Sequence, residues 1–181
     1  MNSKVHTSRS PRQPDQVRKR LFDAATTLLS EGLPVSIGTI ADLAGVSKGA
    51  VQHHFGTRDQ LFAALGELYV TEFNDALAME EASDPPAMRY AHLSLKGSSY
   101  KDDKGWRALL VASVVDRGIA ERWSKQVEGE RSSDPVSSPN ALLVRLAADG
   151  LWLSDLLDTY KISNENRDEL ALLMRKLLTD R

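Results

Sequence analysis

The residues best suited to chemistry lie on one face of a short predicted helix: Lys48, Gly49, Gln52 and His53. Val51 and Phe55, four residues apart, predict the buried face of the same helix. A glutamine can pair with adenine through two hydrogen bonds, a lysine can contact a phosphate or guanine, and a histidine can bond a base edge. A major groove about 12 Å wide admits such a helix. These residue types therefore indicate contact with duplex nucleic acid.

Predicted helix starts supply further groups that suit phosphate oxygens. Three hydroxyl residues that favour N-caps mark these starts: Ser36, Ser47 and Thr57. The backbone N–H groups that follow each of them can bind a phosphate, and Arg58 adds a cation at the third start. Two more cations, Arg9 and Arg12, lie in the polar N-terminal segment and could reach an adjacent minor groove or the backbone.

Enzyme and metal chemistry find little support in the sequence. It contains no cysteine, which excludes disulfides, thiolate metal sites and a cysteine nucleophile. Phosphate-binding glycine loops, a nucleophile elbow and the H-E-x-x-H motif are also absent. The acid pairs Glu80-Glu81 and Asp102-Asp103 are adjacent, as are His53 and His54, and adjacent side chains diverge by about 100° on a helix. We therefore expect no enzyme activity, no cofactor and no bound metal.

Composition and charge describe a globular protein with a basic end. Of the 181 residues, 41% are apolar and 27% charged, and no apolar run is long enough to span a membrane. Residues 1–60 carry 8 Lys and Arg against 5 Asp and Glu, whereas the remainder carries 15 against 20. This asymmetry fits either a polyanion partner at one end or a solvated basic tail. Without an apolar leader or membrane segment, the expected location is the cytoplasm.

Helical periodicity accounts for the chain from Pro14 onward, and strand alternation is nowhere convincing. Helices are expected over 14–31, 36–44, 47–55 and 57–81, followed by five more after Pro85-Pro86, with one ending near Gly118. The expected fold is all-α. A flexible basic arm (1–13) precedes a three-helix helix-turn-helix domain (14–60), a connecting helix (about 58–81) and a C-terminal helical domain (82–181).

The run from Ile40 to Leu61 resembles the DNA-binding domain of TetR (tetracycline-repressor-type) transcriptional regulators. The family pattern is I-A-x-x-A-G-V-S-x-G-x, then a hydrophobic residue, Tyr, any residue and His-Phe, then two variable positions and a basic residue three positions before Leu, and the run follows it at all but one of the specified positions. The resemblance covers about residues 14–65. One departure is Gln52, which stands where the family usually has a tyrosine that contacts the DNA backbone, so a backbone contact could become base readout here.

The resemblance implies a homodimer on a palindromic double-stranded DNA operator, since two-fold symmetry in the protein matches symmetry in the DNA. The last two helices are then the expected dimer surface, which would use Ala147, Ala148, Gly150, Leu151, Ser154, Leu170, Leu173, Met174 and Leu177. The alternative is that these apolar residues form one hydrophobic core within a monomer.

The resemblance also implies a small-molecule effector, of unknown identity, bound inside the C-terminal domain. Candidate pocket residues are Met88, His92, Trp106, Leu110, Trp123, Leu146, Asp149 and Trp152. The alternative is that these side chains belong to the core, and that Arg145 and Asp149 form a structural pair at a spacing of four residues.

These inferences favour a dimeric regulator, most simply a repressor that the effector releases from its operator. Two alternatives stay open: a DNA-binding architectural protein without an effector, and a helical binding protein that no longer engages DNA. A preformed cavity between the C-terminal helices would favour the regulator over the architectural protein. The sequence does not decide between repression and activation.

Overall fold

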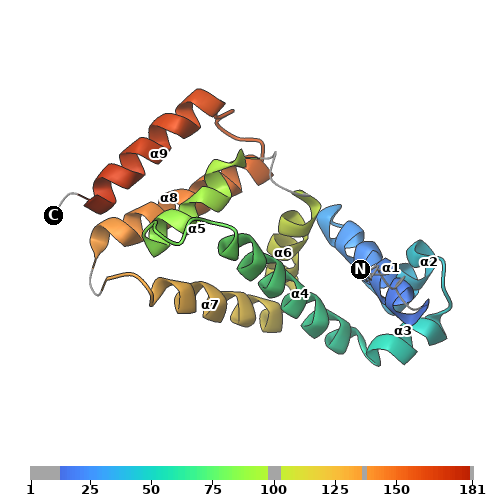
Figure 1. Cartoon of the computed structure of the whole chain (residues 1–181). Helices are drawn as coiled ribbons and strands as arrows, with labels where there is room; N and C mark the ends of the chain where they lie inside the picture. Colours follow the sequence, from blue (N-terminus) through green and yellow to red (C-terminus); the bar gives the residue numbers. More distant parts are fainter. Residues whose placement is uncertain (1–12, 98–102, 136–137, 180–181) are drawn as a thin grey trace, which may run out of the picture.

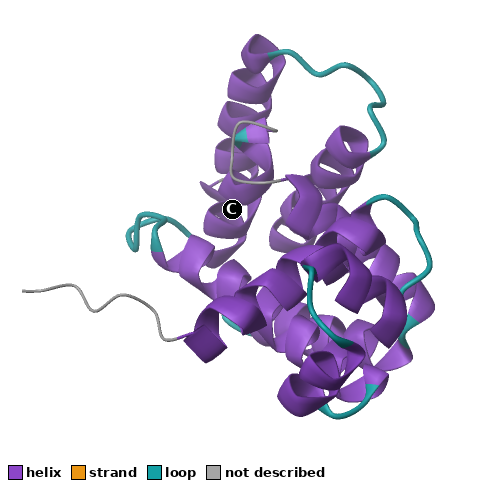
Figure 2. Ribbon diagram, turned by 90° about the vertical axis from the view of Figure 1, so that its right-hand side faces the viewer, coloured by secondary structure: helices purple, strands orange, loops and turns teal. Residues whose placement is uncertain are grey.

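The computed structural model describes residues 13–97, 103–135 and 138–179, and within these ranges the chain forms α-helices and loops (Figures 1 and 2). The helices are α1 (Gln13–Ser30), α2 (Ile37–Ala44), α3 (Lys48–Phe55), α4 (Arg58–Ala78), α5 (Pro86–Leu95), α6 (Asp103–Val115), α7 (Arg117–Arg131), α8 (Pro139–Leu156) and α9 (Asn164–Thr179). The expected all-α class is confirmed. The predicted DNA contacts Arg9 and Arg12 lie outside the described residues.

Local capping explains why α2 and α3 are short and separate. The Ser36 hydroxyl accepts the backbone N–H of Thr39 at 3.1 Å, and the Thr39 hydroxyl accepts the N–H of Ser36 at 2.9 Å. Gly45 ends α2 with a φ of 65°, which a residue without a Cβ adopts at low cost. Ser47 then caps α3 by accepting the N–H of Ala50 at 3.1 Å. These contacts fix the tight turn between the two helices.

The long helix α4 joins the two halves of the molecule (Figure 1). Its start is held by a reciprocal capping box, in which Gln60 N–H bonds the Thr57 hydroxyl and Thr57 N–H bonds the Gln60 side chain. Leu61 and Leu65, near this start, are fully buried against α1, α2 and α3, whereas Phe73 is buried against the C-terminal helices. One helix therefore contributes to both hydrophobic clusters.

The first cluster extends beyond the N-terminal helices, because α6 lies along α1. Ala108, Leu109 and Ala112 of α6 pack with Leu21 and Ala25 of α1 in this cluster. The N-terminal half therefore shares its core with α6, a helix that comes much later in the chain.

The second cluster lies between α5, α8 and α9 and the end of α4. The boundary between α6 and α7 differs from the sequence expectation near Gly118. Asp116 caps α7 by accepting the N–H of Ile119 at 3.1 Å, so Gly118 lies inside α7 rather than ending the helix before it. No helix in the described ranges is long and apolar enough to cross a membrane.

Candidate functional site

The α3 helix presents the predicted polar face to solvent. Lys48, Gly49, Gln52 and His53 are exposed, as expected for residues that meet a partner. On the opposite side Val51 is fully buried and Phe55 is 6% exposed. The structure thus brings the four predicted residues together on one accessible surface.

Aromatic contacts fix the buried side of α3 on α1. The rings of Phe55 and Phe22 are 5.1 Å apart, and the Arg18 guanidinium lies over both, 4.8 Å from the Phe55 centroid. His54 lies beside Phe55, and the centroids of their rings are 6.4 Å apart. Because both ends of this contact are aromatic, the outer face of α3 is held at a defined angle to α1.

Helix N-termini beside α3 offer backbone N–H groups to an anion. Ser36, Ser47 and Thr57 are all exposed N-caps, at the starts of α2, α3 and α4. The Lys48 stem crosses from α3 to α2, because a Cβ built on Gly38 would lie 3.2 Å from Lys48 Cε. The lysine head thereby stands beside the α2 start, where a phosphate could meet both.

Arg58 has a structural role that its sequence position did not predict. Its Nε donates to the Val35 carbonyl at 3.2 Å, and its guanidinium lies 4.1 Å from the Phe62 ring centroid. These contacts fasten the start of α4 to the loop before α2. The side chain is still 42% exposed, so its terminal nitrogens can reach an anion.

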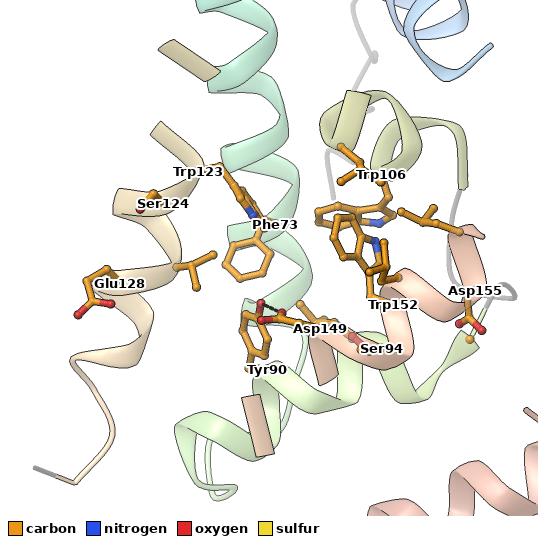
Figure 3. A pocket seen from close by; sticks show the side chains of 17 residues that line it. Phe73, Tyr90, Ser94, Trp106, Trp123, Ser124, Glu128, Asp149, Trp152 and Asp155 are labelled. Carbon is orange, nitrogen blue, oxygen red and sulfur yellow. Dashed lines mark hydrogen bonds between the residues drawn. The ribbon is translucent and has the colours of Figure 1, made fainter. Parts of the chain in front are cut away.

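A cavity of about 520 Å³ lies among α4, α5, α6, α7 and α8 (Figure 3). Its lining comprises Phe73, Tyr90, Leu93, Ser94, Gly97, Trp106, Leu110, Trp123, Ser124, Val127, Glu128, Asp149, Gly150, Trp152, Leu153, Asp155 and Leu156. Five of the predicted pocket residues are in this set: Trp106, Leu110, Trp123, Asp149 and Trp152. The volume and the apolar lining are those of a small-molecule site.

Three predicted pocket residues lie elsewhere. Met88 is fully buried in the second cluster, because α5 turns that face toward the core. His92 Nδ1 lies 3.3 Å from the Glu80 carboxylate and 3.7 Å from that of Asp84, on the far side of α5 from the cavity lining. Leu146 is 58% exposed on the outer side of α8. Helical spacing alone could not assign these faces, since apolar residues occur on several sides of α5 and α8.

Sequence reasoning missed two ring residues that shape the cavity, Phe73 and Tyr90. Phe73 lies on the connecting helix and is 5.0 Å from Trp123 and 5.9 Å from Tyr90, measured between ring centroids. Trp106 is 6.0 Å from Trp123 and 6.4 Å from Trp152. The rings therefore form a continuous set of edge-to-face contacts along the wall. A phenylalanine on the α4 stripe was the available signal for the first of them.

The polar centre of the cavity is Asp149. The Tyr90 hydroxyl donates to its Oδ1 at 2.5 Å (Figure 3). Burial raises the pKa of the Asp149 carboxyl above its ordinary value, and burial together with the nearby carboxylate raises the pKa of Tyr90. Arg145 does not pair with Asp149, as its spacing of four residues had suggested, but with Asp134. It donates to both carboxylate oxygens of Asp134, at 2.5 and 3.2 Å.

An apolar stripe runs along the outer side of α8, and α9 exposes two leucines as well. The exposed residues are Leu142, Leu143, Leu146, Leu153, Leu157, Leu172 and Leu173. Of the predicted dimer residues, Ala147, Gly150 and Leu173 are exposed, and Leu170 and Leu177 are half-buried against the second cluster. The prediction was wrong for four others, which are buried inside the single chain: Ala148, Leu151, Ser154 and Met174.

Family models match most of the chain. Residues 75–179 match the model described as tetracyclin repressor-like, C-terminal domain. Residues 21–65 match the model of bacterial regulatory proteins of the tetR family, which includes all of α2 and α3. Among curated proteins, a search finds no sequence match.

Several solved structures share the fold. A transcriptional regulator from Rhodococcus sp. is 24% identical to this chain, with an alignment that covers 92% of this chain and 96% of the other and a TM-score of 0.64. A TetR-family member from Streptomyces coelicolor is 21% identical over 87% and 97% of the two chains, with a TM-score of 0.68. The multidrug-binding protein EbrR, solved with imidazole, is 23% identical over 98% of both chains, with a TM-score of 0.66.

Proposed function

This chain belongs to the TetR family of transcriptional regulators, and we propose that it is a homodimeric repressor released from a palindromic operator by a small molecule. Family membership makes it a transcription regulator with a helix-turn-helix DNA-binding domain. The observation that carries the proposal is the exposed polar face of α3 above a fully packed apolar underside. Such a helix is held rigidly and keeps its hydrogen-bonding side chains free for a groove. We place its action in the cytoplasm, where such a regulator meets DNA.

The DNA contacts divide by chemistry. Gln52 and His53, in the middle of the exposed α3 face, read base edges, and Lys48 and Gly49 contact the edge of the groove. The N-termini at Ser36, Ser47 and Thr57, together with Arg58, hold the phosphates on either side. The first group sets sequence preference, whereas the second sets the position of the protein on the duplex. Arg9 and Arg12, which lie outside the described residues, would add contacts in the minor groove.

Dimerisation supplies the second copy of α3 that a palindrome requires. The apolar stripe of α8 supports this role, because large apolar side chains at successive turns of one helix mark an interaction surface. Gly150 lies in the same stripe, and a Cβ placed on it would have no atom of its own chain within 4 Å. Residues of a second α8 can therefore approach closely at this point.

Ligand control needs a cavity that is mechanically linked to the DNA-binding half. Trp106 and Leu110 line the cavity from α6, and α6 packs directly on α1. Phe73 lines it from α4, whose first turns belong to the core beneath α3. Gly150 and Leu153 belong both to the lining and to the exposed side of α8. A ligand that favours one position of these helices thereby favours one spacing of the two DNA-reading heads.

Selection from a library of random-sequence duplexes tests the proposal. The wild-type chain should enrich a palindromic sequence, and Gln52→Ala should change the preferred base at one position in each half-site. Gln126→Ala is the matched control, because Gln126 lies on the distant α7, where its side-chain amide donates to Asn74 of α4 at 2.7 Å. This variant should select the same sequence as the wild type.

Other results of the selection point to the alternatives. Equal retention of all duplexes would favour an architectural protein, and retention of none would favour a helical binding protein that does not engage DNA. A selected site without a dyad would contradict the dimer.

A further inference from the structure

The wall of the cavity combines aromatic rings with acidic groups. Its rings are Phe73, Tyr90, Trp106, Trp123 and Trp152, and its carboxylates are Glu128, Asp149 and Asp155. Among the described residues that line it, none is a lysine, arginine or histidine. The side chains that a ligand touches therefore offer π-faces and negative charge.

Two of the three carboxylates are already neutralised from outside the cavity. Glu128 receives two hydrogen bonds from Arg131, at 2.9 and 2.6 Å. Asp155 is paired with Arg167, which is itself buried and also donates to the Ser94 carbonyl at 3.0 Å. These two acids therefore add little net negative charge to the wall that a ligand contacts.

Asp149 differs, because the partner of its carboxylate is the uncharged hydroxyl of Tyr90. The closest cation along α8 is Arg145, whose guanidinium lies 4.9 Å from the Tyr90 ring centroid. Arg145 is 3% exposed; its Nε and Nη2 donate to Asp134 and to the Glu130 carbonyl, whereas its buried Nη1 has no hydrogen-bond partner among the described residues. Asp134 thus takes the ion-pair hydrogen bonds of Arg145, which acts on Asp149 only through space, and the hydrogen bond to the Asp149 carboxylate comes from the uncharged Tyr90.

We propose that the effector is an organic cation, with an apolar body packed among the five rings and its positive charge beside Asp149. This inference rests on the proposed function, in which this cavity is the effector site. An aromatic face attracts a cation, most strongly where water is excluded. A carboxylate that has lost water on burial regains favourable interactions when a cation approaches it.

An anion of equal size meets the opposite conditions. It would lose its hydration and meet the Asp149 carboxylate in a wall whose described lining residues include no cation. The electron-rich faces of the rings would repel it as well. Discrimination by charge, at constant size and shape, is therefore the property that this cavity should show.

Tetraphenylphosphonium and tetraphenylborate are the probes, since these ions have nearly the same shape and opposite charges. Binding is followed through the fluorescence of the three tryptophans, all of which line the cavity. Wild-type protein should bind the phosphonium at least about tenfold more tightly than the borate, the scale of one cation–π or charge contact. Asp149→Asn keeps an acceptor for Tyr90 and should weaken phosphonium binding by about tenfold while leaving borate binding equal or stronger.

Glu121→Gln is the matched control, because Glu121 is an acid of α7 that lies outside the cavity lining and is paired with Arg117; it should change phosphonium binding by less than about twofold. Equal binding of the two ions, binding of neither, or an unchanged phosphonium affinity in Asp149→Asn overturns the inference. Because no DNA is present, this outcome is independent of the duplex selection. A protein that selects a palindrome but ignores probe charge remains a regulator with another effector class. One that discriminates the ions but selects no DNA retains the cation site and loses the proposed function.

Discussion

Replacing Leu146 by glutamate should dissociate the proposed dimer. Leu146 lies in the middle of the α8 stripe and is 58% exposed in the single chain. A two-fold axis through this stripe would bring the residue into the interface twice, once from each protomer. The substitution places a carboxylate there in each copy and leaves the core of the chain untouched.

The expected magnitude follows from the exposed area of the side chain. Burying a whole leucine side chain is worth about 1.5–3 kcal/mol, so burying the 58% that the single chain leaves exposed is worth roughly 1–1.5 kcal/mol. Two symmetric copies give roughly 2–3 kcal/mol, before the cost of dehydrating the carboxylates. At 1.4 kcal/mol per factor of ten, the dissociation constant should rise roughly 100-fold.

Sedimentation velocity over a concentration series measures this change. Leu43→Glu is the control, because Leu43 is a leucine of similar exposure, 52%, on α2 and distant from α8. The control should self-associate like the wild type, whereas Leu146→Glu should sediment as a monomer at concentrations where the wild type is dimeric. Equal self-association of all three proteins would refute the assignment of the α8 stripe as the dimer surface.

Three further predictions concern stability. Gly45→Ala should lower the free energy of unfolding, measured in urea, by about 1 kcal/mol, because Gly45 has a φ of 65°. Gly45→Asn should lower it by less, and equal losses in the two variants would contradict this backbone argument. Asp134→Asn should lower the free energy of unfolding by about 3 kcal/mol, because it leaves Arg145 charged without its partner at 4% side-chain exposure. A loss under about 1 kcal/mol would contradict a stabilising role for this buried ion pair. Arg175 lowers the pKa of the Asp84 carboxyl, so ionised Asp84 stabilises the fold above about pH 4 and this contribution disappears as pH falls through the lowered pKa. Wild type should therefore exceed Asp84→Asn in stability near pH 7 and converge with it in acid; a gap that does not narrow as the pH falls would count against the ion pair.

Local chemistry made the N-terminal half predictable. The helix boundaries there depend on capping residues and on Gly45, all of which act within four positions along the chain. The exposed face of α3 follows from Val51 and Phe55, because two buried residues on a helix of eight leave one side free. The packing of α6 on α1 had no such signal, since it joins segments far apart in the sequence.

The C-terminal half was predictable in kind but not in detail. Apolar residues surround α8 on several sides, so the pattern could not separate the core-facing Ala148 and Leu151 from the exposed Leu143 and Leu146. The three tryptophans were predicted correctly as cavity residues, because large rings make up much of the wall of any cavity that they border. The contact between Tyr90 and Asp149 joins residues 59 positions apart, which no spacing rule along one helix reveals.

The position of α3 on DNA can be measured directly, because the chain has no natural cysteine. His53→Cys then carries the single thiol, on the exposed face of α3, and iron–EDTA attached there cleaves the DNA strands next to it. On the selected duplex, we predict two cleavage clusters related by the dyad, with centres one helical turn of roughly 10 base pairs apart or a multiple of it. The same reagent on Leu43→Cys of α2 should give weaker and displaced cleavage. A single cluster at His53→Cys, or cleavage spread evenly along the duplex, would contradict the account.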